Sequence, residues 1–230
     1  YSKVPSQTMK KLRKAFDKND HDRFSTWLTR LQKKDPSVKV NAKTLHPHEL
    51  VRSYFSDSSW SGNLVAEPDP VIEAQWTSLL ELVRKTSALE KTLVLTDVSG
   101  SMYGGYSNTS VRPIDVSIAL SLLIARTSTA PWNDSVIAFS ANPTFWKIPD
   151  GTLLDMCRDI KNIEQGFNTN FYKVFKQIIA RHDQYKLKPE EHPEQIIVIS
   201  DMQFDTADNN SGTNLFGLSG TSTEHSSVEK

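Results

Sequence analysis

The sequence contains almost no cysteine and no long hydrophobic run. Cys157 is the only cysteine among 230 residues, so an internal disulfide cannot form, and this favours a reducing compartment, for which we expect the cytoplasm. The longest apolar stretch, residues 118–125, contains Ser121 and is far shorter than the roughly 20 residues of a membrane-spanning helix. The chain begins with Tyr1 and has no apolar signal segment, which predicts an internal fragment of a longer protein. No membrane contact is therefore expected.

Charge is balanced over the chain but unevenly distributed along it. Residues 1–50 contain 12 Lys and Arg against five Asp and Glu, and the remainder has the opposite excess. A basic arm of this kind is able to bind RNA or another anionic surface, or to dock on its acidic neighbour. The lysines are dispersed over helical faces, which favours docking or plain solvation. The candidate RNA-binding residues are Lys10, Lys11, Arg13 and Lys14.

Residues 1–87 are predicted to be a helical segment, the C-terminal part of a larger helical region. Apolar residues recur at spacings of three and four near the start, which predicts two short amphipathic helices. A third helix is predicted to begin at Pro47, a residue suited to the first helical turn. Its apolar face comprises Leu50, Val51, Tyr54 and Phe55. The stretch "EPDPVIEAQWTSLLELVRKT" predicts a longer fourth helix.

Residues 88–205 are predicted to form an α/β domain. The predicted strands are 91–96, 135–140, 144–148 and 195–200, and the predicted helices are 113–129, 151–162 and 169–185. Strands that alternate with helices, and continuous apolar runs such as "LVL" and "IIVIS", indicate a doubly wound, mostly parallel sheet. The second and third strands are too close for a helical crossover and are predicted to pair antiparallel. Residues 206–230 are a polar tail without an assignment.

The stretch "LVLTDVSGSM" joins a predicted strand to a loop that contains one carboxylate and two hydroxyls. Asp97, Ser99 and Ser101 alternate along this loop. In open α/β sheets, ligands bind outside the carboxyl ends of the strands. Such oxygen atoms suit Mg²⁺, which retains several waters. Two more candidate ligands are Thr169, near the start of a predicted helix, and Asp201, directly after the last strand.

The order Asp-x-Ser-x-Ser, then Thr169, then Asp201 resembles the metal-ion-dependent adhesion site of a von Willebrand factor A domain. The resemblance implies that Ser99, Ser101 and Thr169 bind the metal directly or through water. It also implies that Asp97 and Asp201 act directly or from just outside the ligand set. Mg²⁺ is the expected ion, with Mn²⁺ as the alternative. A metal held by neutral hydroxyls keeps an open position, which in this family accepts an acidic side chain of a partner protein.

A narrower resemblance rests on five stretches of the sequence. They are "VPSQTMKKLRKAF", "NAKTLHPHELV", "TLVLTDVSGSM", "PIDVSIALSLLIA" and "VISDMQFD". Together they are similar to a family of plants, protists and giant viruses that joins a helical region to an A domain and is distantly related to the Ro (TROVE) ribonucleoprotein. The similarity spans most of residues 1–205. It implies the fold and the metal site, and by analogy with the Ro protein it makes RNA the alternative partner.

Two other interpretations begin from the same loop. A haloacid-dehalogenase phosphatase would use Asp97 as nucleophile and Lys173 to neutralise phosphate, but its general acid would stand where Ser99 is. Alternatively, Asp97 and the serines only satisfy the backbone, with no metal. Cys157 lies in a predicted helix, and His182 and His192 have no evident partner in the sequence. We therefore expect a non-enzymatic interaction module.

Overall fold

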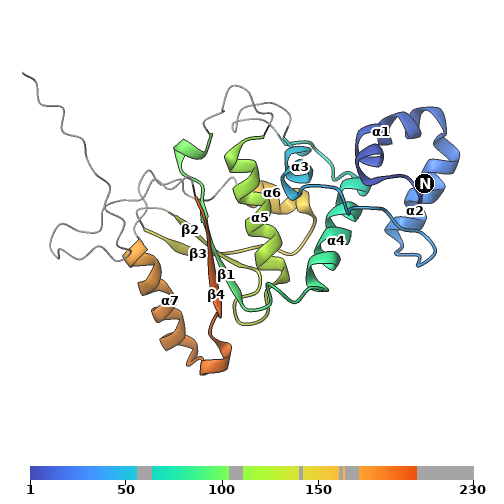
Figure 1. Cartoon of the computed structure of the whole chain (residues 1–230). Coiled ribbons are helices and arrows are strands. Elements are labelled where there is room, and N and C mark those ends of the chain that lie inside the picture. Colours follow the sequence, from blue (N-terminus) through green and yellow to red (C-terminus); the bar gives the residue numbers. More distant parts are fainter. Residues whose placement is uncertain (56–63, 104–110, 140–141, 161–162, 164–170, 201–230) are drawn as a thin grey trace, which may run out of the picture.

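A mostly parallel sheet lies at the centre of the computed structural model, which describes residues 1–55, 64–103, 111–139, 142–160, 163 and 171–200 (Figure 1). Its strands are β1 (Thr92–Asp97), β2 (Ser135–Phe139), β3 (Thr144–Lys147) and β4 (Gln195–Ile199), in the order β3-β2-β1-β4. β1 pairs in parallel with β2 and with β4, whereas β2 and β3 pair antiparallel. The predicted sheet and the predicted hairpin are thus confirmed.

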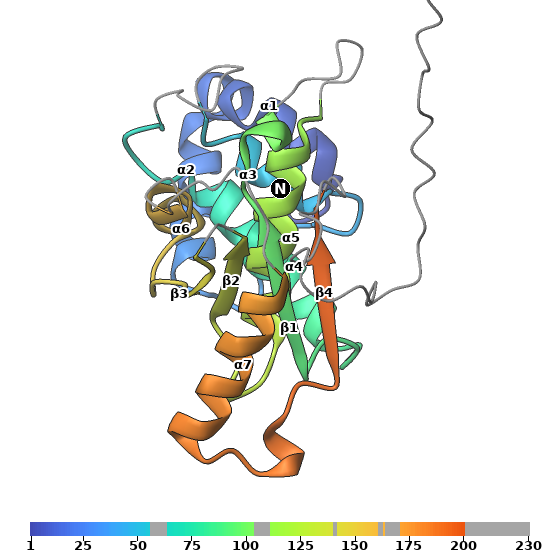
Figure 2. The ribbon, with the colours of Figure 1, turned by 90° about the vertical axis from the view of Figure 1, so that its left-hand side faces the viewer.

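Helices cover both faces of this sheet. They are α1 (Ser6–Asn19), α2 (His21–Gln32), α3 (Pro47–Arg52), α4 (Pro70–Arg84), α5 (Pro113–Thr127), α6 (Leu153–Ile160) and α7 (Phe171–Tyr185). Figures 1 and 2 show α7 on one face and α5, with α3, α4 and α6 behind it, on the other. No helix in the described ranges is long and apolar enough to cross a bilayer. The arrangement is doubly wound, as the alternating pattern predicts.

The strand β1 is buried on both sides because its alternate residues belong to different cores. Val94 packs in the large core on the α5 side. Leu93 and Leu95 pack with Val174 of α7 on the opposite side. This explains why the strand is continuously apolar and does not alternate. It also fixes Asp97, the last residue of β1, at the end of a strand that is rigidly held.

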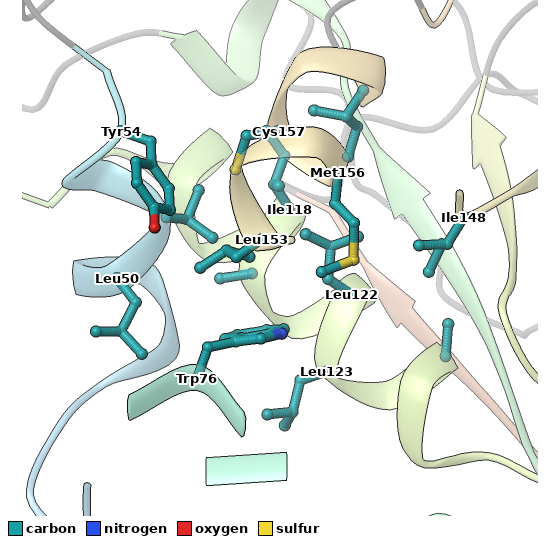
Figure 3. Close-up of a cluster of buried hydrophobic side chains, with 14 of the residues drawn as sticks. Leu50, Tyr54, Trp76, Ile118, Leu122, Leu123, Ile148, Leu153, Met156 and Cys157 are labelled. Atoms are coloured by element: carbon teal, nitrogen blue, oxygen red, sulfur yellow. The ribbon is translucent and has the colours of Figure 1, made fainter. Parts of the chain in front are cut away.

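The large core joins the helical segment to the α/β part of the chain (Figure 3). Leu50 of α3 and Trp76 of α4 share this core with Ile118 of α5 and Met156 of α6. The remaining helices α1 and α2 pack around a smaller cluster, which α4 contacts through Val71. Residues from both sides of the predicted border at residue 88 therefore stabilise one another.

A carboxylate of the helical segment also caps a helix of the α/β part. Glu73 of α4 accepts hydrogen bonds from the backbone N–H groups of Leu153 (2.8 Å) and Leu154 (3.2 Å), at the start of α6. The Tyr54 hydroxyl donates to the same carboxylate, at 2.5 Å. The first N–H groups of a helix have no partner within the helix, so Glu73 satisfies two that would otherwise be orphaned.

The third helix is shorter than predicted. It ends at Arg52, so Tyr54 and Phe55 follow the helix and are not part of its face. Both are nevertheless buried, because they pack in the large core. Tyr54 also bonds Glu73, and Phe55 forms an isolated bridge with Leu64. Apolar spacing alone predicted the burial correctly and the helix end wrongly. The predicted tail, residues 206–230, lies outside the described residues.

Candidate metal site

The loop after β1 lies where the connections of the sheet change direction. β1 is followed along the chain by α5 and then by β2 on one side of it, whereas β4 lies on its other side. Ligands of open α/β sheets bind at such switch points, beyond the carboxyl ends of the strands. Asp97 ends β1 and Ser200 follows β4, and the Ser200 hydroxyl donates to Asp97 Oδ2 at 2.8 Å. The two strand ends therefore meet where a ligand is expected.

Three of the predicted ligands lie together in this loop. Asp97 is 1% exposed and Ser99 is 8% exposed, whereas Ser101 is exposed at the surface. The Ser99 N–H donates to Asp97 Oδ1 at 2.8 Å, and the two serine hydroxyl oxygens are 3.0 Å apart. The loop then enters a short 3₁₀ helix, Gly100–Tyr103. The polar residues of the loop thus extend from a buried carboxylate to an exposed serine.

The backbone of Asp97 is held from α5. The Ser117 hydroxyl donates to the Asp97 carbonyl at 2.9 Å and lies 2.8 Å from the Thr96 hydroxyl. Ser117 is fully buried. Neither Ser117 nor Ser200 was predicted. Ser117 is a polar residue in the apolar stretch "PIDVSIALSLL", and Ser200 directly precedes a predicted ligand; both signals are present in the sequence.

The charge of Asp97 has no cationic partner in the described part of the chain. Its two oxygens accept hydrogen bonds from a backbone N–H and from a hydroxyl, and it forms no ion pair there. A buried carboxylate is costly unless a positive charge compensates it. Each carboxylate oxygen can also accept a second bond. A cation bound here would compensate this charge.

The donor set fits Mg²⁺. Neighbouring ligands of an octahedral Mg²⁺ at about 2.0 to 2.1 Å lie about 2.9 Å from each other. The hydroxyl groups of Ser99 and Ser101 are hydrogen-bonded to each other at 3.0 Å, a separation that is also close to this spacing. Within the described ranges, no group of three or more His, Cys, Asp or Glu side chains is placed to hold a metal. The predicted set differs from such a group, because it combines two carboxylates with three hydroxyls.

The predicted ligands Thr169 and Asp201 lie outside the described residues, so their part in the site stays a prediction. Lys173, the phosphate-neutralising residue of the phosphatase hypothesis, donates to Asn142 Oδ1 at 3.0 Å. Asn142 belongs to the β2–β3 connection, which follows the carboxyl end of β2. Lys173 is therefore held near the same edge of the sheet as Asp97.

The other reactive side chains considered are one cysteine and two histidines. Cys157 is buried in the large core, and burial raises the pKa of its thiol. His182 and His192 have no evident partner in the sequence, and in the structure His182 Nδ1 and His192 Nε2 are 3.0 Å apart. His192 precedes the amino end of β4, at the opposite end of this strand from Ser200.

Two of the four candidate RNA-binding side chains form ion pairs. Lys10 Nζ is 3.8 Å from Glu49 Oε1, and Arg13 pairs with Asp69. Lys11 and Lys14 are exposed to solvent. Part of the positive charge of α1 is therefore neutralised by neighbouring carboxylates, and RNA binding by this helix stays a prediction.

Sequence comparisons match the chain to two families. The family described as "Domain of unknown function (DUF2828)" matches residues 1–89. The "Uncharacterized protein L728" of Acanthamoeba polyphaga mimivirus is 29% identical over 221 residues, which confirms the predicted giant-virus similarity. This alignment covers 90% of the chain but only 36% of that relative. The family described as "Domain of unknown function (DUF7788)" matches residues 91–230, more than half of the chain. The chain therefore belongs to the DUF7788 family.

Proposed function

We propose that this protein is a metal-dependent protein-interaction module of the von Willebrand factor A type. In this proposal an acidic side chain of a partner binds to Mg²⁺ held by the loop after β1. One observation carries the proposal: Asp97 is a carboxylate 1% exposed, at the switch point of the sheet, that forms no ion pair in the described residues. A cation at this place compensates a charge that otherwise costs stability.

In this proposal the buried carboxylate and the hydroxyls of the loop have different roles. The hydroxyls of Ser99 and Ser101, with that of Thr169 in the predicted set, hold the ion. Asp97 supplies negative charge from the buried side of the loop. The hydrogen bonds from Ser200 and from the Ser99 N–H fix the carboxylate of Asp97. When bound, Mg²⁺ supplies a positive charge that neutral hydroxyls leave largely uncompensated. Because Ser101 is exposed, a partner carboxylate can approach from the solvent side.

The surroundings support a binding function over a catalytic one. The thiol of Cys157 is buried in the core, and this burial raises its pKa and keeps it protonated. The His182 and His192 pair lies toward the amino end of β4, whereas Asp97 and Ser200 lie at the carboxyl ends of the strands. Neither group is therefore placed to act as nucleophile or base at the loop.

The proposal is tested by replacing Mg²⁺ with Mn²⁺, which enhances the relaxation of water protons that exchange at the ion. An acidic peptide that contains one Glu is then titrated, and the same peptide with Gln is the matched control. We expect enhancement with the wild type, and a decrease when the Glu peptide displaces water. The Gln peptide should leave the signal unchanged. No enhancement, or equal effects of both peptides, would contradict the proposal.

A further inference from the structure

Two imidazole rings meet between the last turn of α7 and the segment that leads into β4. His182 belongs to α7, and His192 lies three residues before β4. Figures 1 and 2 show the end of α7 and the start of β4 at the same end of the sheet. His182 is half-buried and His192 is exposed. The pair therefore lies at the surface, at the opposite end of β4 from Ser200 and the candidate metal site.

The fold itself holds the two histidines close to each other. His182 is part of the helix α7. Beside His192, the Glu191 carbonyl accepts a hydrogen bond from Nε1 of the buried Trp132, at 2.7 Å. The His192 N–H donates to the Pro189 carbonyl at 3.3 Å. Because both backbones are fixed in this way, an ion that binds both rings would cost little conformational entropy.

The distance between the facing nitrogens fits two metal ligands at a right angle. Bonds from a metal ion to imidazole nitrogen are about 2.0 to 2.1 Å long, so two nitrogens at a right angle lie about 2.9 Å apart, and at a tetrahedral angle about 3.3 to 3.4 Å. His182 Nδ1 and His192 Nε2 are 3.0 Å apart, closer to the first value. Square-planar or tetragonal sites of nitrogen and oxygen ligands are typical of Cu²⁺ and Ni²⁺, whereas Zn²⁺ sites are mostly tetrahedral.

The two rings are also inclined to the line that joins these nitrogens. Their centroids are 4.8 Å apart, and their planes meet at 74°. If both rings pointed straight along this line, the centroid separation would be the 3.0 Å between the nitrogens plus the radii of both rings, which exceeds 4.8 Å. Such an inclination is required when the lone pairs of two imidazoles converge on one ion.

Neutral imidazoles can exchange their mutual hydrogen bond for an ion without losing a proton. Without an ion, one ring donates its N–H to the lone pair of the other. When an ion binds, this proton moves to the second nitrogen of the same ring, so that both facing nitrogens present lone pairs. Neither second nitrogen has a hydrogen-bond partner among the described residues, so it is able to carry the proton.

The surroundings offer nitrogen and water ligands to a cation. In the described ranges, no third His, Cys, Asp or Glu is placed to join the pair, so waters fill the remaining positions. The thiol of Cys157 is buried in the large core and does not compete. The segment 183–193 has three acidic and two basic residues, a net charge of −1, and does not repel a cation; they are Asp183, Glu190 and Glu191, with Lys186 and Lys188.

We propose that His182 and His192 form a binding site for a divalent transition-metal ion with square-planar or tetragonal coordination. His182 Nδ1 and His192 Nε2 are neighbouring ligands, and waters occupy the other positions. Cu²⁺ is the ion that binds most tightly, because divalent first-row ions bind a given site in an order that peaks at Cu²⁺. The bound ion joins the end of α7 to the segment before β4. It is separate from the proposed Mg²⁺ in its ligands and in its place.

The test is titration of the whole chain, without a histidine tag, with Cu²⁺ in the presence of saturating Mg²⁺. Electron paramagnetic resonance identifies the ligands, because bound nitrogens split the Cu²⁺ signal and oxygens do not. We expect one tightly bound Cu²⁺ per chain, with splitting from two nitrogens, and weaker binding of Zn²⁺ in a parallel calorimetric titration. A Cu²⁺ signal without nitrogen splitting, or Zn²⁺ binding as tight as that of Cu²⁺, would overturn the proposal.

The variant Asp97→Asn separates this test from that of the Mg²⁺ site. Its Cu²⁺ signal and Cu²⁺ affinity should equal those of the wild type, whether or not Mg²⁺ binds at the loop after β1. Loss of the nitrogen-split signal in Asp97→Asn would overturn the proposal.

Three histidine variants make the test specific. His182→Gln and His192→Gln each remove one nitrogen ligand, and each should weaken Cu²⁺ binding at least about tenfold, because the second ligand of a chelate binds intramolecularly. His46→Gln is the matched control, since the His46 and His48 rings are also neighbours, with centroids 5.5 Å apart, but are stacked at 16°. It should leave Cu²⁺ binding unchanged. Circular dichroism shows whether His182→Gln is folded, and the exposed His192 provides the result if it is not. Equal losses in all three variants, or no loss in His192→Gln, would overturn the proposal.

Discussion

Glu73 joins the helical segment to the α/β part, so replacing it with alanine should destabilise the whole protein. The substitution removes the acceptor of two backbone N–H groups at the start of α6 and of the buried Tyr54 hydroxyl. A hydrogen bond to a charged group contributes roughly 1.5 to 3 kcal/mol, and loss of a helix cap costs roughly 0.5 to 2 kcal/mol. These overlapping contributions give an expected loss of about 3 kcal/mol in the free energy of unfolding.

The measurement is urea unfolding followed by tryptophan fluorescence, with thermal unfolding as a second readout. For a chain of this size, a loss of about 3 kcal/mol lowers Tm by roughly 6 to 12 °C. Glu81→Ala is the matched control, because Glu81 is an exposed carboxylate on the same helix. Its loss should be below about 0.5 kcal/mol. Equal losses for both variants would refute the role of Glu73 as a cap between the two parts.

Three more predictions concern a thiol, a carboxylate and the basic helix. Burial raises the pKa of the Cys157 thiol, so we expect iodoacetamide labelling at pH 8 only after unfolding; rapid labelling of the folded chain would contradict its burial. For Glu49, burial alone would raise the pKa, but the bonds from the His46 backbone and Gln7 outweigh it and lower the pKa. Its stabilisation is therefore present above the unfolded pKa and lost as the pH falls through the folded pKa. Gln7→Ala should reduce the loss of stability at low pH, measured by acid unfolding. An acid unfolding curve unchanged by Gln7→Ala would contradict the role of the Gln7 hydrogen bond. If the RNA alternative holds, RNA affinity should fall steeply with salt concentration. The double substitution Lys11→Gln with Lys14→Gln should then make this salt dependence less steep. An RNA affinity that does not depend on salt would exclude RNA binding by this helix.

The elements of the fold were predictable because their apolar patterns are local. The strand β1 and the strand β4 are continuous apolar runs, and each predicted boundary agrees with the structure to within one residue. The end of α3 was not predictable, because Tyr54 continues the helical spacing while its hydroxyl bonds Glu73, which is 19 residues away. A contact of this kind depends on where α4 lies, and spacing does not encode that.

The candidate site was predictable in part for the same reason. Asp97, Ser99 and Ser101 are close in sequence, so the loop itself brings them together. The contacts of Asp97 with Ser117 and Ser200 join residues that are 20 and 103 positions apart. These contacts follow from the β1–β4 pairing and from the crossing of α5, and only the structure shows them.

The central claim, a Mg²⁺ site in the loop after β1, is tested most directly by calorimetric titration of Mg²⁺ into the wild type and into Asp97→Asn. This substitution keeps the size of the side chain and removes its charge. Asp183→Asn is the matched control, because Asp183 is an exposed carboxylate on α7. The account predicts one ion bound by the wild type and by Asp183→Asn, and none by Asp97→Asn. Binding of Mg²⁺ by Asp97→Asn at wild-type affinity, or no binding by any of the three, would contradict it.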